Sequence, residues 1–441
     1  MQAERILTLR EKLSYGCGDL ASNLLWGITG SFILYYYTDV YRLPVSQVAL
    51  LLLLVRVVDA VVDPLVGWLI DRSRDAWLVV RLIKWLALPF GVISLLAFLP
   101  LPLSAHGRLA WAYFTYAALG AIYAGINTPY SILGGLMTRS PQQRVVLNAF
   151  RMIGAQCGLL IVSFFTLPAV HWLGGGDSTT AELRGFPLFM AAIGLLGSLM
   201  WWVTLSGCRV RHPPVPQQFR LKSLLAALLA NRSWRLATAA FALYFVSLSA
   251  CSSFALYYSR SVLQQSLGFG GIILTLVNVF SLAGNASVPL LCRYLGRRAL
   301  LVSAYLLQIL LLVTIGMLPD RLAIFLPLFA LVSLLQGVNS PVFYALLADS
   351  IDEGMAQTGI RAAGLAWALN TLMTKVAFAL TGALLALLLA AGDYQPDALL
   401  QTQHTRHYIA AGFIWLPVIA CLLALPLLWR LPDEQKIVDN K

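Results

Sequence analysis

The sequence predicts an all-α polytopic membrane protein, and two observations support this prediction. Of the 441 residues, 59% are hydrophobic and 11% are charged, whereas soluble globular proteins have about 45–50% apolar and about 25% charged residues. Apolar runs that reach the length of a spanning helix, about 20 residues, recur along the whole chain. The composition therefore excludes a water-soluble enzyme, a disordered chain and a secreted disulfide scaffold.

Twelve segments are long and apolar enough to be transmembrane helices. Their apolar residues run continuously, whereas the strands of a membrane barrel alternate over about 10 residues. In order, they cover residues 13–37, 45–70, 78–101, 108–137, 146–170, 185–206, 234–259, 268–292, 299–317, 322–350, 360–390 and 407–430.

The basic residues predict how these spans are oriented. With both termini in the cytoplasm, 22 of the 31 Lys and Arg residues fall on the cytoplasmic side and three fall inside spans. The six on the opposite side are Arg42, Arg108, Arg184, Arg260, Arg321 and Arg406. This is a strong positive-inside bias. It explains the net charge of +12 without a nucleic-acid partner, and we expect an integral protein of a bacterial inner (plasma) membrane.

The spans divide into two sets of six. We predict an N-terminal six-helix bundle over 1–206, a basic cytoplasmic linker loop over 207–233, and a C-terminal six-helix bundle over 234–441. A weak repeat supports the division, because Phe32-Ile-Leu-Tyr-Tyr resembles Phe254-Ala-Leu-Tyr-Tyr and Pro64-Leu-Val resembles Pro289-Leu-Leu. The two offsets, 222 and 225 residues, are each about half of the chain.

Six ionisable residues lie inside predicted spans. They are Asp19, Arg56, Asp59, Asp63, Arg151 and Lys375. A charge at the bilayer centre costs about 2.5–3.5 kcal/mol on insertion scales, so such residues usually face a cavity or a partner. The three acids and three bases form a set that is neutral when all six are ionised.

Asp59 and Asp63 are four residues apart and share a helix face with Arg56. Two carboxylates this close repel each other, which raises the proton affinity of at least one. A bound cation or proton relieves the repulsion, so the pair is suited to bind H⁺, Na⁺ or Li⁺. The alternative is a structural ion pair with Arg56 that only holds helices together.

Other polar groups suit a ligand with several hydroxyls. Asp19 lies beside Gly16 and Gly18, which allow a neighbouring helix to approach. Asn127 precedes Pro129 in the fourth span, where proline frees a backbone carbonyl. Carboxylate and amide oxygens accept hydrogen bonds from hydroxyls, and Arg and Lys donate to them. Aromatic candidates for stacking on a sugar face are Trp26, Tyr123, Tyr130, Tyr344 and Trp367, although helix or lipid packing is the alternative for each.

No motif for catalysis, a metal or an organic cofactor is present. Gly174-Gly-Gly176 has no following Lys-Ser/Thr, so we interpret it as a turn and not as a phosphate loop. The six cysteines have no paired spacing and are predicted to be small buried hydrophobic residues. We therefore expect no enzyme and no cofactor other than a coupling ion.

At these residues the chain resembles the glycoside–pentoside–hexuronide cation symporters, a melibiose-permease-like branch of the major facilitator superfamily. The most specific string is Arg56-Val-Val-Asp59-Ala-Val-Val-Asp63-Pro, while Asp71-Arg72 is generic to the superfamily. Further matching segments are Tyr15-Gly-Cys-Gly-Asp19, Tyr36-Tyr-Thr-Asp39-Val, Asn127-Thr-Pro-Tyr130, Met137-Thr138 and Asn148-Ala-Phe-Arg151-Met-Ile-Gly154.

The resemblance implies the major facilitator fold and cation-driven symport of a sugar or glycoside by alternating access. It implies that Asp59 and Asp63 bind the coupling cation. It also implies a sugar site made of Asp19, Asn127, Arg151, Asn370, Thr371 and Lys375. We expect four of them, Asp19, Asn127, Arg151 and Lys375, to converge on one cavity between the bundles.

Two departures from melibiose permease favour H⁺ over Na⁺. Ala124 stands where that protein has a threonine hydroxyl in its sodium site, and Val62 stands where it has an asparagine. Ser131 and Ser340 take the places of tryptophans in its sugar site, so the resemblance leaves the sugar open.

Charged residues near the cytoplasmic ends suggest a gate. Asp71, Arg72, Arg297 and Arg298 lie in or beside corresponding loops, and Asp349 and Asp352 end the tenth span. We hypothesise that these opposite charges latch the cytoplasmic side. Single surface ion pairs contribute only about 0–1 kcal/mol, so the latch requires a network.

The expected partners are a sugar or glycoside, a monovalent cation and membrane lipid, and we expect a monomer. Within transport, the alternative is a lysolipid or other amphiphile symporter of the same superfamily branch. Outside it, the alternatives are a channel or sensor and a membrane enzyme, but central charges between two bundles argue against an open pore.

Overall fold

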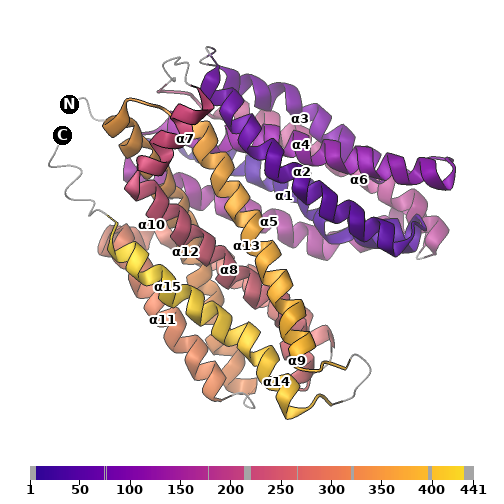
Figure 1. The fold of residues 1–441 in the computed structure, drawn as a ribbon. Helices are drawn as coiled ribbons and strands as arrows, with labels where there is room; N and C mark the ends of the chain where they lie inside the picture. Colours follow the sequence, from indigo (N-terminus) through magenta and orange to yellow (C-terminus); the bar gives the residue numbers. More distant parts are fainter. Residues whose placement is uncertain are drawn as a thin grey trace. The chain divides into compact units, whose positions relative to one another are not determined.

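The computed structural model describes residues 6–73, 75, 77–176, 178–212, 220–265, 267–318, 322–395 and 400–431, and throughout these ranges the regular elements are helices. Figure 1 shows them as long ribbons. Contacts between Cα atoms divide the chain into two compact units. One comprises Met1–Leu225 with Ile360–Leu372, and the other comprises Ala226–Gly359 with Met373–Lys441.

The first unit contains the helices of the N-terminal half. They are α1 (Leu9–Tyr35), η1 (Tyr36–Val40, a π-helical segment), α2 (Val45–Arg72), α3 (Leu78–Ala97), α4 (Ala105–Met137), α5 (Pro141–Gly174) and α6 (Thr179–Gly207). In this unit α1 packs on α5 and α6, α3 packs on α4 and α6, and α2 packs on α4 (Figure 1). The helices α1 and α4 also touch, and the candidate site develops along this contact.

Side chains that precede these helices set their starting points. Thr8 and Glu11 form a reciprocal capping box at α1. Ser104, Ser140 and Ser178 each accept a backbone hydrogen bond at the start of α4, α5 and α6. Such caps satisfy N–H groups that have no partner within the helix.

The second unit contains most of the remaining helices. They are α8 (Arg232–Ser253), α9 (Ala255–Ser261), α10 (Leu267–Leu295), α11 (Arg297–Met317), α12 (Leu322–Thr358), most of α13 (Ala363–Ala391), α14 (Gln403–Ala410), η2 (Ala411–Trp415, π-helical) and α15 (Leu416–Trp429). The core of this unit includes stacked rings of Tyr258, Phe325, Phe329 and Phe413.

The structure confirms the predicted all-helical class. Ten of its described helical segments are long and apolar enough to cross a membrane, and they correspond to the third to twelfth predicted spans. The first two predicted spans correspond to α1 and α2, which have 27 and 28 residues and hold most of the intramembrane charges. The count of twelve spans stays a prediction.

The region predicted as a linker loop contains a short helix. Residues 221–230 form α7 (Leu221–Ala230), an apolar helix followed by Asn231, which caps α8. Residues 213–219, with the three prolines of the predicted loop, lie outside the described ranges.

Candidate functional site

The structure joins Asp19 and Arg151 in a buried ion pair. Nε of Arg151 lies 2.6 Å from Oδ2 of Asp19, and the side chains are 4% and 8% exposed. Removing two charges from water is expensive, and close pairing offsets much of that penalty. A bidentate acceptor and a five-donor guanidinium are thereby held in the interior of the first unit.

Glycines at the crossing of α1 and α5 bring this pair together. A Cβ atom on Gly154 would lie 2.1 Å from the carbonyl oxygen of Gly16, so the two backbones touch. Arg151 is three residues before Gly154, and Asp19 is three residues after Gly16. Because residues three apart lie on neighbouring parts of a helix face, the crossing directs Asp19 and Arg151 toward each other.

Two tyrosines from α1 and α4 pack against the ion pair. The guanidinium carbon of Arg151 lies 4.8 Å from the ring centroid of Tyr130, within cation–π range. The ring of Tyr130 stacks on Tyr15 with centroids 4.7 Å apart, and its hydroxyl donates to the Tyr15 carbonyl oxygen. Sequence reasoning assigned Tyr15 no role, although its position four residues before Asp19 places both on one helix face.

A second aromatic pair lies farther along the same two helices. Trp26 of α1 stacks on Tyr123 of α4, with centroids 4.5 Å apart and ring planes 15° apart. Both side chains are half-buried. Trp26 follows Asp19 by seven residues and Tyr123 precedes Tyr130 by seven, so the stack lies about 10 Å from the ion pair along the helices.

Asn127 lies between these two features on α4. It is four residues after Tyr123 and three before Tyr130, so the three residues share a helix face. Its side chain is half-buried. Together, α1 and α4 offer a carboxylate, an amide and a flat aromatic pair, and α5 adds the guanidinium of Arg151. This set of groups suits a ring with several hydroxyls.

The predicted cation site lies on α2, which packs on α4. Asp63 is buried, with 1% of its surface exposed. The side chains of Arg56 and Asp59 lie outside the part of the chain that the structure describes. Ala124 on α4 is also buried, and its methyl group supplies no oxygen ligand.

The predicted sugar-site residues of α13 fall in both units. Asn370 is buried, and the Thr371 hydroxyl donates to the carbonyl oxygen of Trp367 at 3.1 Å. Both belong to the first unit, whereas the half-buried Lys375 belongs to the second. The convergence of Lys375 with Asp19 therefore stays a prediction.

The candidate gating residues form separate contacts. Asp71 accepts hydrogen bonds from the backbone N–H groups of Gly364 and Leu365, each at 2.8 Å. Arg72 lies over the ring of Trp68 at 5.1 Å from its centroid. Asp71 thus uses backbone partners at the start of α13, which the latch hypothesis did not include.

The other gating residues belong to the second unit. Arg297 at the start of α11 forms an ion pair with Asp349 of α12. Arg298 donates to the carbonyl oxygen of Trp429. Asp352 is exposed on α12. These contacts join helices of one unit, so the latch as a whole stays a prediction.

Comparison with known proteins decides the family. The family model described as "MFS/sugar transport protein" matches residues 14–434, nearly the whole chain. The protein belongs to this family. The predicted resemblance to the glycoside cation symporters of the major facilitator superfamily is thereby confirmed.

Individual relatives agree with this assignment. The chain is 27% identical to the inner membrane symporter YicJ of Escherichia coli K12 over 423 residues, covering 95% of this chain and 90% of that protein. It is 26% identical to the isoprimeverose transporter of Lactiplantibacillus pentosus over 441 residues, covering 96% and 89%. Among solved structures, the fucose:proton symporter FucP of Escherichia coli shares the fold, with a TM-score of 0.69, 14% identity and coverage of 94% and 97%.

Proposed function

We propose that this member of the sugar transport family is a secondary active transporter that moves a sugar or glycoside together with a cation by alternating access. The observation that carries the proposal is the buried Asp19–Arg151 pair, flanked by tyrosines and followed along α1 and α4 by Asn127 and the Trp26–Tyr123 stack. The names of the relatives, a symporter and an isoprimeverose transporter, support the same class of activity.

In this proposal Asp19 and Arg151 bind substrate hydroxyls while remaining paired. A carboxylate has about four lone-pair sites and a guanidinium has five N–H donors, so one mutual contact leaves capacity on both. Asn127 adds a donor and an acceptor, and the Trp26–Tyr123 pair contacts the apolar face of the sugar ring. Asn370, Thr371 and Lys375 complete the site from α13.

Coupling is assigned to Asp59 and Asp63, with H⁺ favoured. Sodium takes several oxygen ligands, but Val62 and Ala124 offer none from their side chains. A proton needs only one carboxylate whose proton affinity is high, and the proximity of two acids supplies it. We place the protein in a bacterial inner membrane with both termini in the cytoplasm, on the distribution of its basic residues.

Counterflow in proteoliposomes tests this proposal. Vesicles loaded with one unlabelled methyl glycoside of xylose, glucose, galactose or glucuronic acid are diluted into a trace of the same compound in labelled form. A carrier accumulates label transiently for at least one of these compounds, and a channel does not.

The Trp26→Ala variant separates substrate binding from general folding. We expect the sugar concentration that half-saturates counterflow to rise about twofold to thirteenfold, because stacking on an aromatic ring contributes about 0.5–1.5 kcal/mol. Trp172→Ala is the matched control, since Trp172 is 81% exposed and lies outside the proposed site. Equal effects of the two changes would refute the assignment of Trp26.

A further inference from the structure

A pocket lined by several charged side chains lies where α1 begins and α6 ends, away from the proposed sugar site. Its volume is about 580 Å³, and its polar lining comes from Thr8, Arg10, Glu11, Ser206, Arg209 and Arg211. Three arginines and one glutamate give this lining a net positive charge. The proposed transport cycle uses none of these residues.

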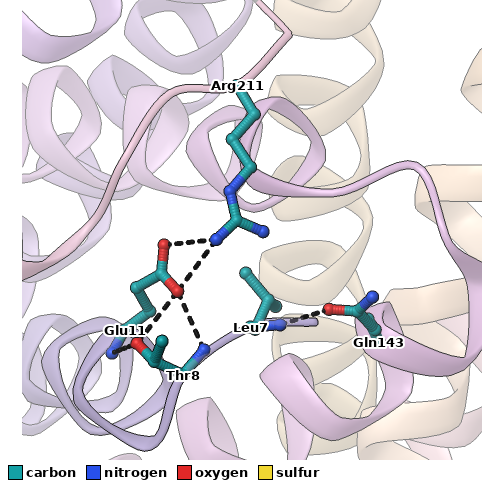
Figure 2. Close-up of polar contacts among 5 residues, drawn as sticks. All are labelled: Leu7, Thr8, Glu11, Gln143 and Arg211. Carbon is teal, nitrogen blue, oxygen red and sulfur yellow. Dashed lines mark hydrogen bonds and ion pairs between the residues drawn. The ribbon is translucent and has the colours of Figure 1, made fainter. Parts of the chain in front are cut away.

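The single acid of the pocket is already engaged. Glu11 binds Nη2 of Arg211 through both carboxylate oxygens, at 2.8 and 3.0 Å, and accepts from the backbone and hydroxyl of Thr8 (Figure 2). Burial raises the pKa of Glu11, but the Thr8 hydrogen bonds and Arg211 outweigh it and bring the pKa below its usual value. Glu11 therefore stays ionised and neutralises Arg211.

Two arginines of the pocket remain uncompensated. Arg10 and Arg209 are exposed, and within the described ranges neither forms an ion pair. Hydrogen bonds hold the backbone close to each of them in the sequence. The N–H of Leu7 donates to the Gln143 side chain at 2.7 Å (Figure 2), and the N–H groups of Arg211 and His212 both donate to the carbonyl oxygen of Leu136.

Apolar side chains lead from this pocket toward the membrane. Leu9 and Leu13 on α1 are 63% and 53% exposed, and Leu199 and Val203 on α6 are each 46% exposed. Each pair is four residues apart and so lies on one helix face. Leu9 adjoins Arg10, and Val203 is one turn before Ser206, so both apolar stripes end at the pocket.

From this arrangement we propose that the pocket binds the phosphate of an anionic membrane lipid, with Arg10 and Arg209 as its charged ligands. Basic pockets at the membrane–water interface bind such head groups. The adjoining leucines and valine contact the acyl chains, which a soluble phosphate does not have. This favours a lipid over inorganic phosphate as the source of the anion.

Native mass spectrometry of the full chain in detergent tests the proposal with phosphatidylglycerol, phosphatidylcholine and inorganic phosphate as probes. We expect the parent protein to bind phosphatidylglycerol more tightly than phosphatidylcholine. Inorganic phosphate at equal concentration should not displace it.

The variant Arg10→Gln/Arg209→Gln should weaken phosphatidylglycerol binding by about 25-fold, since each basic residue near an anionic lipid surface contributes about fivefold. The matched control is Arg232→Gln/Arg235→Gln, which removes two exposed arginines at the start of α8 and should leave binding unchanged. Ser206→Asp, which keeps both arginines but adds a negative charge to the pocket, should also weaken binding.

Three results would overturn the proposal. They are equal weakening in the pocket and control variants, equal affinity for the two lipids, and displacement of the lipid by inorganic phosphate at equal concentration. If the double variant fails to fold, Ser206→Asp becomes the test of the proposal. Phosphatidylglycerol binding that is unchanged in Ser206→Asp then contradicts lipid binding at this pocket.

Discussion

At the scale of single residues, the ion pair between Asp19 and Arg151 joins α1 and α5, and it is also the centre of the proposed sugar site. Their side chains are almost fully buried, so removal of one partner leaves the other as an uncompensated charge. Such a change is strongly destabilising, by about 3–5 kcal/mol. Removal of either side chain is therefore expected to lower stability in addition to any effect on the proposed transport.

We predict that Asp19→Asn lowers the unfolding temperature and abolishes binding of the transported sugar. The double variant Asp19→Asn/Arg151→Gln should regain much of the unfolding temperature but no sugar binding, because both charges are gone. Thermal unfolding in detergent, with and without sugar, measures both effects.

Glu182→Gln provides the control for this experiment. Glu182 is another buried acid of the first unit, paired with His171 at 3.0 Å and with the Tyr35 hydroxyl at 2.8 Å. This variant should unfold at a lower temperature than the parent protein, yet the transported sugar should still raise its unfolding temperature. If the sugar raises the unfolding temperature of Asp19→Asn by as much as that of the parent protein, Asp19 has only a structural role.

A second prediction concerns the acids of α2. Asp59→Asn or Asp63→Asn mimics a permanently protonated carboxyl group, so uphill accumulation should be lost while sugar exchange across the membrane continues. Exchange does not require release of the proton. Accumulation and counterflow measured on the same vesicles separate the two activities, and unimpaired accumulation in both variants would contradict the assignment.

The sequence supported some residue assignments better than others. The cost of charge in lipid singled out Asp19 and Arg151, and the structure pairs them. The stack of Trp26 on Tyr123 was not predicted, because ring contacts between α1 and α4 depend on helix rotation that neither sequence pattern specifies. Each ring alone is equally compatible with packing against lipid.

At the scale of elements, α2 and α13 make a close contact inside the first unit. A Cβ atom on Gly67 would lie 2.3 Å from the carbonyl oxygen of Gly364. One turn farther along α2, Asp71 accepts the N–H groups of Gly364 and Leu365, which begin α13. A carboxylate at this position also interacts favourably with the positive end of the helix dipole.

This contact should depend on pH. Asp71 lies just beyond the predicted span 45–70. Burial raises its pKa to about 7, and the hydrogen bonds from Leu365 and Gly364 together with Arg361 offset only part of that effect. A raised pKa means that Asp71 binds a proton more tightly when α2 and the start of α13 are in contact than when this contact is broken. Stability from this group is therefore fully present below its ordinary pKa of 3.8 and is lost as pH rises through about 7.

Hydrogen exchange of residues 360–372 measures this effect. Protection relative to an unstructured peptide should fall between pH 6 and pH 8 (roughly one unit either side of the raised pKa) in the parent protein. Asp71→Asn should remove the pH dependence, because an amide does not titrate. A pH dependence that persists in this variant would assign the effect to another group.

Other elements show where hydropathy has little predictive value. The seventh predicted span is interrupted at Phe254, between α8 and α9, and the twelfth contains the π-helical segment η2. These irregular segments meet, since a Cβ atom on Gly412 would lie 2.0 Å from the Phe254 ring. Hydropathy reports the length of an apolar run, but it does not report such local changes in hydrogen bonding, which arise from packing between distant segments.

At the scale of the whole molecule, composition and spacing predicted most of what the comparisons show. Long apolar runs predicted a helical membrane protein, and the Arg-x-x-Asp-Ala-x-x-Asp-Pro string indicated the symporter branch that the family assignment supports. The pocket between Arg10 and Arg209 was not predicted, because these residues are almost 200 residues apart and only the packing of α1 on α6 brings them together.

Uphill accumulation of a labelled sugar in proteoliposomes is the most direct test of cation-coupled symport. Vesicles are given an inward proton gradient without sodium, an inward sodium gradient at constant pH, or no gradient. We predict accumulation above the external concentration under the proton gradient, with alkalinisation of the external medium when sugar is added. Accumulation driven only by sodium would reject the proton but keep symport, whereas simple equilibration under every gradient would contradict cation-coupled transport.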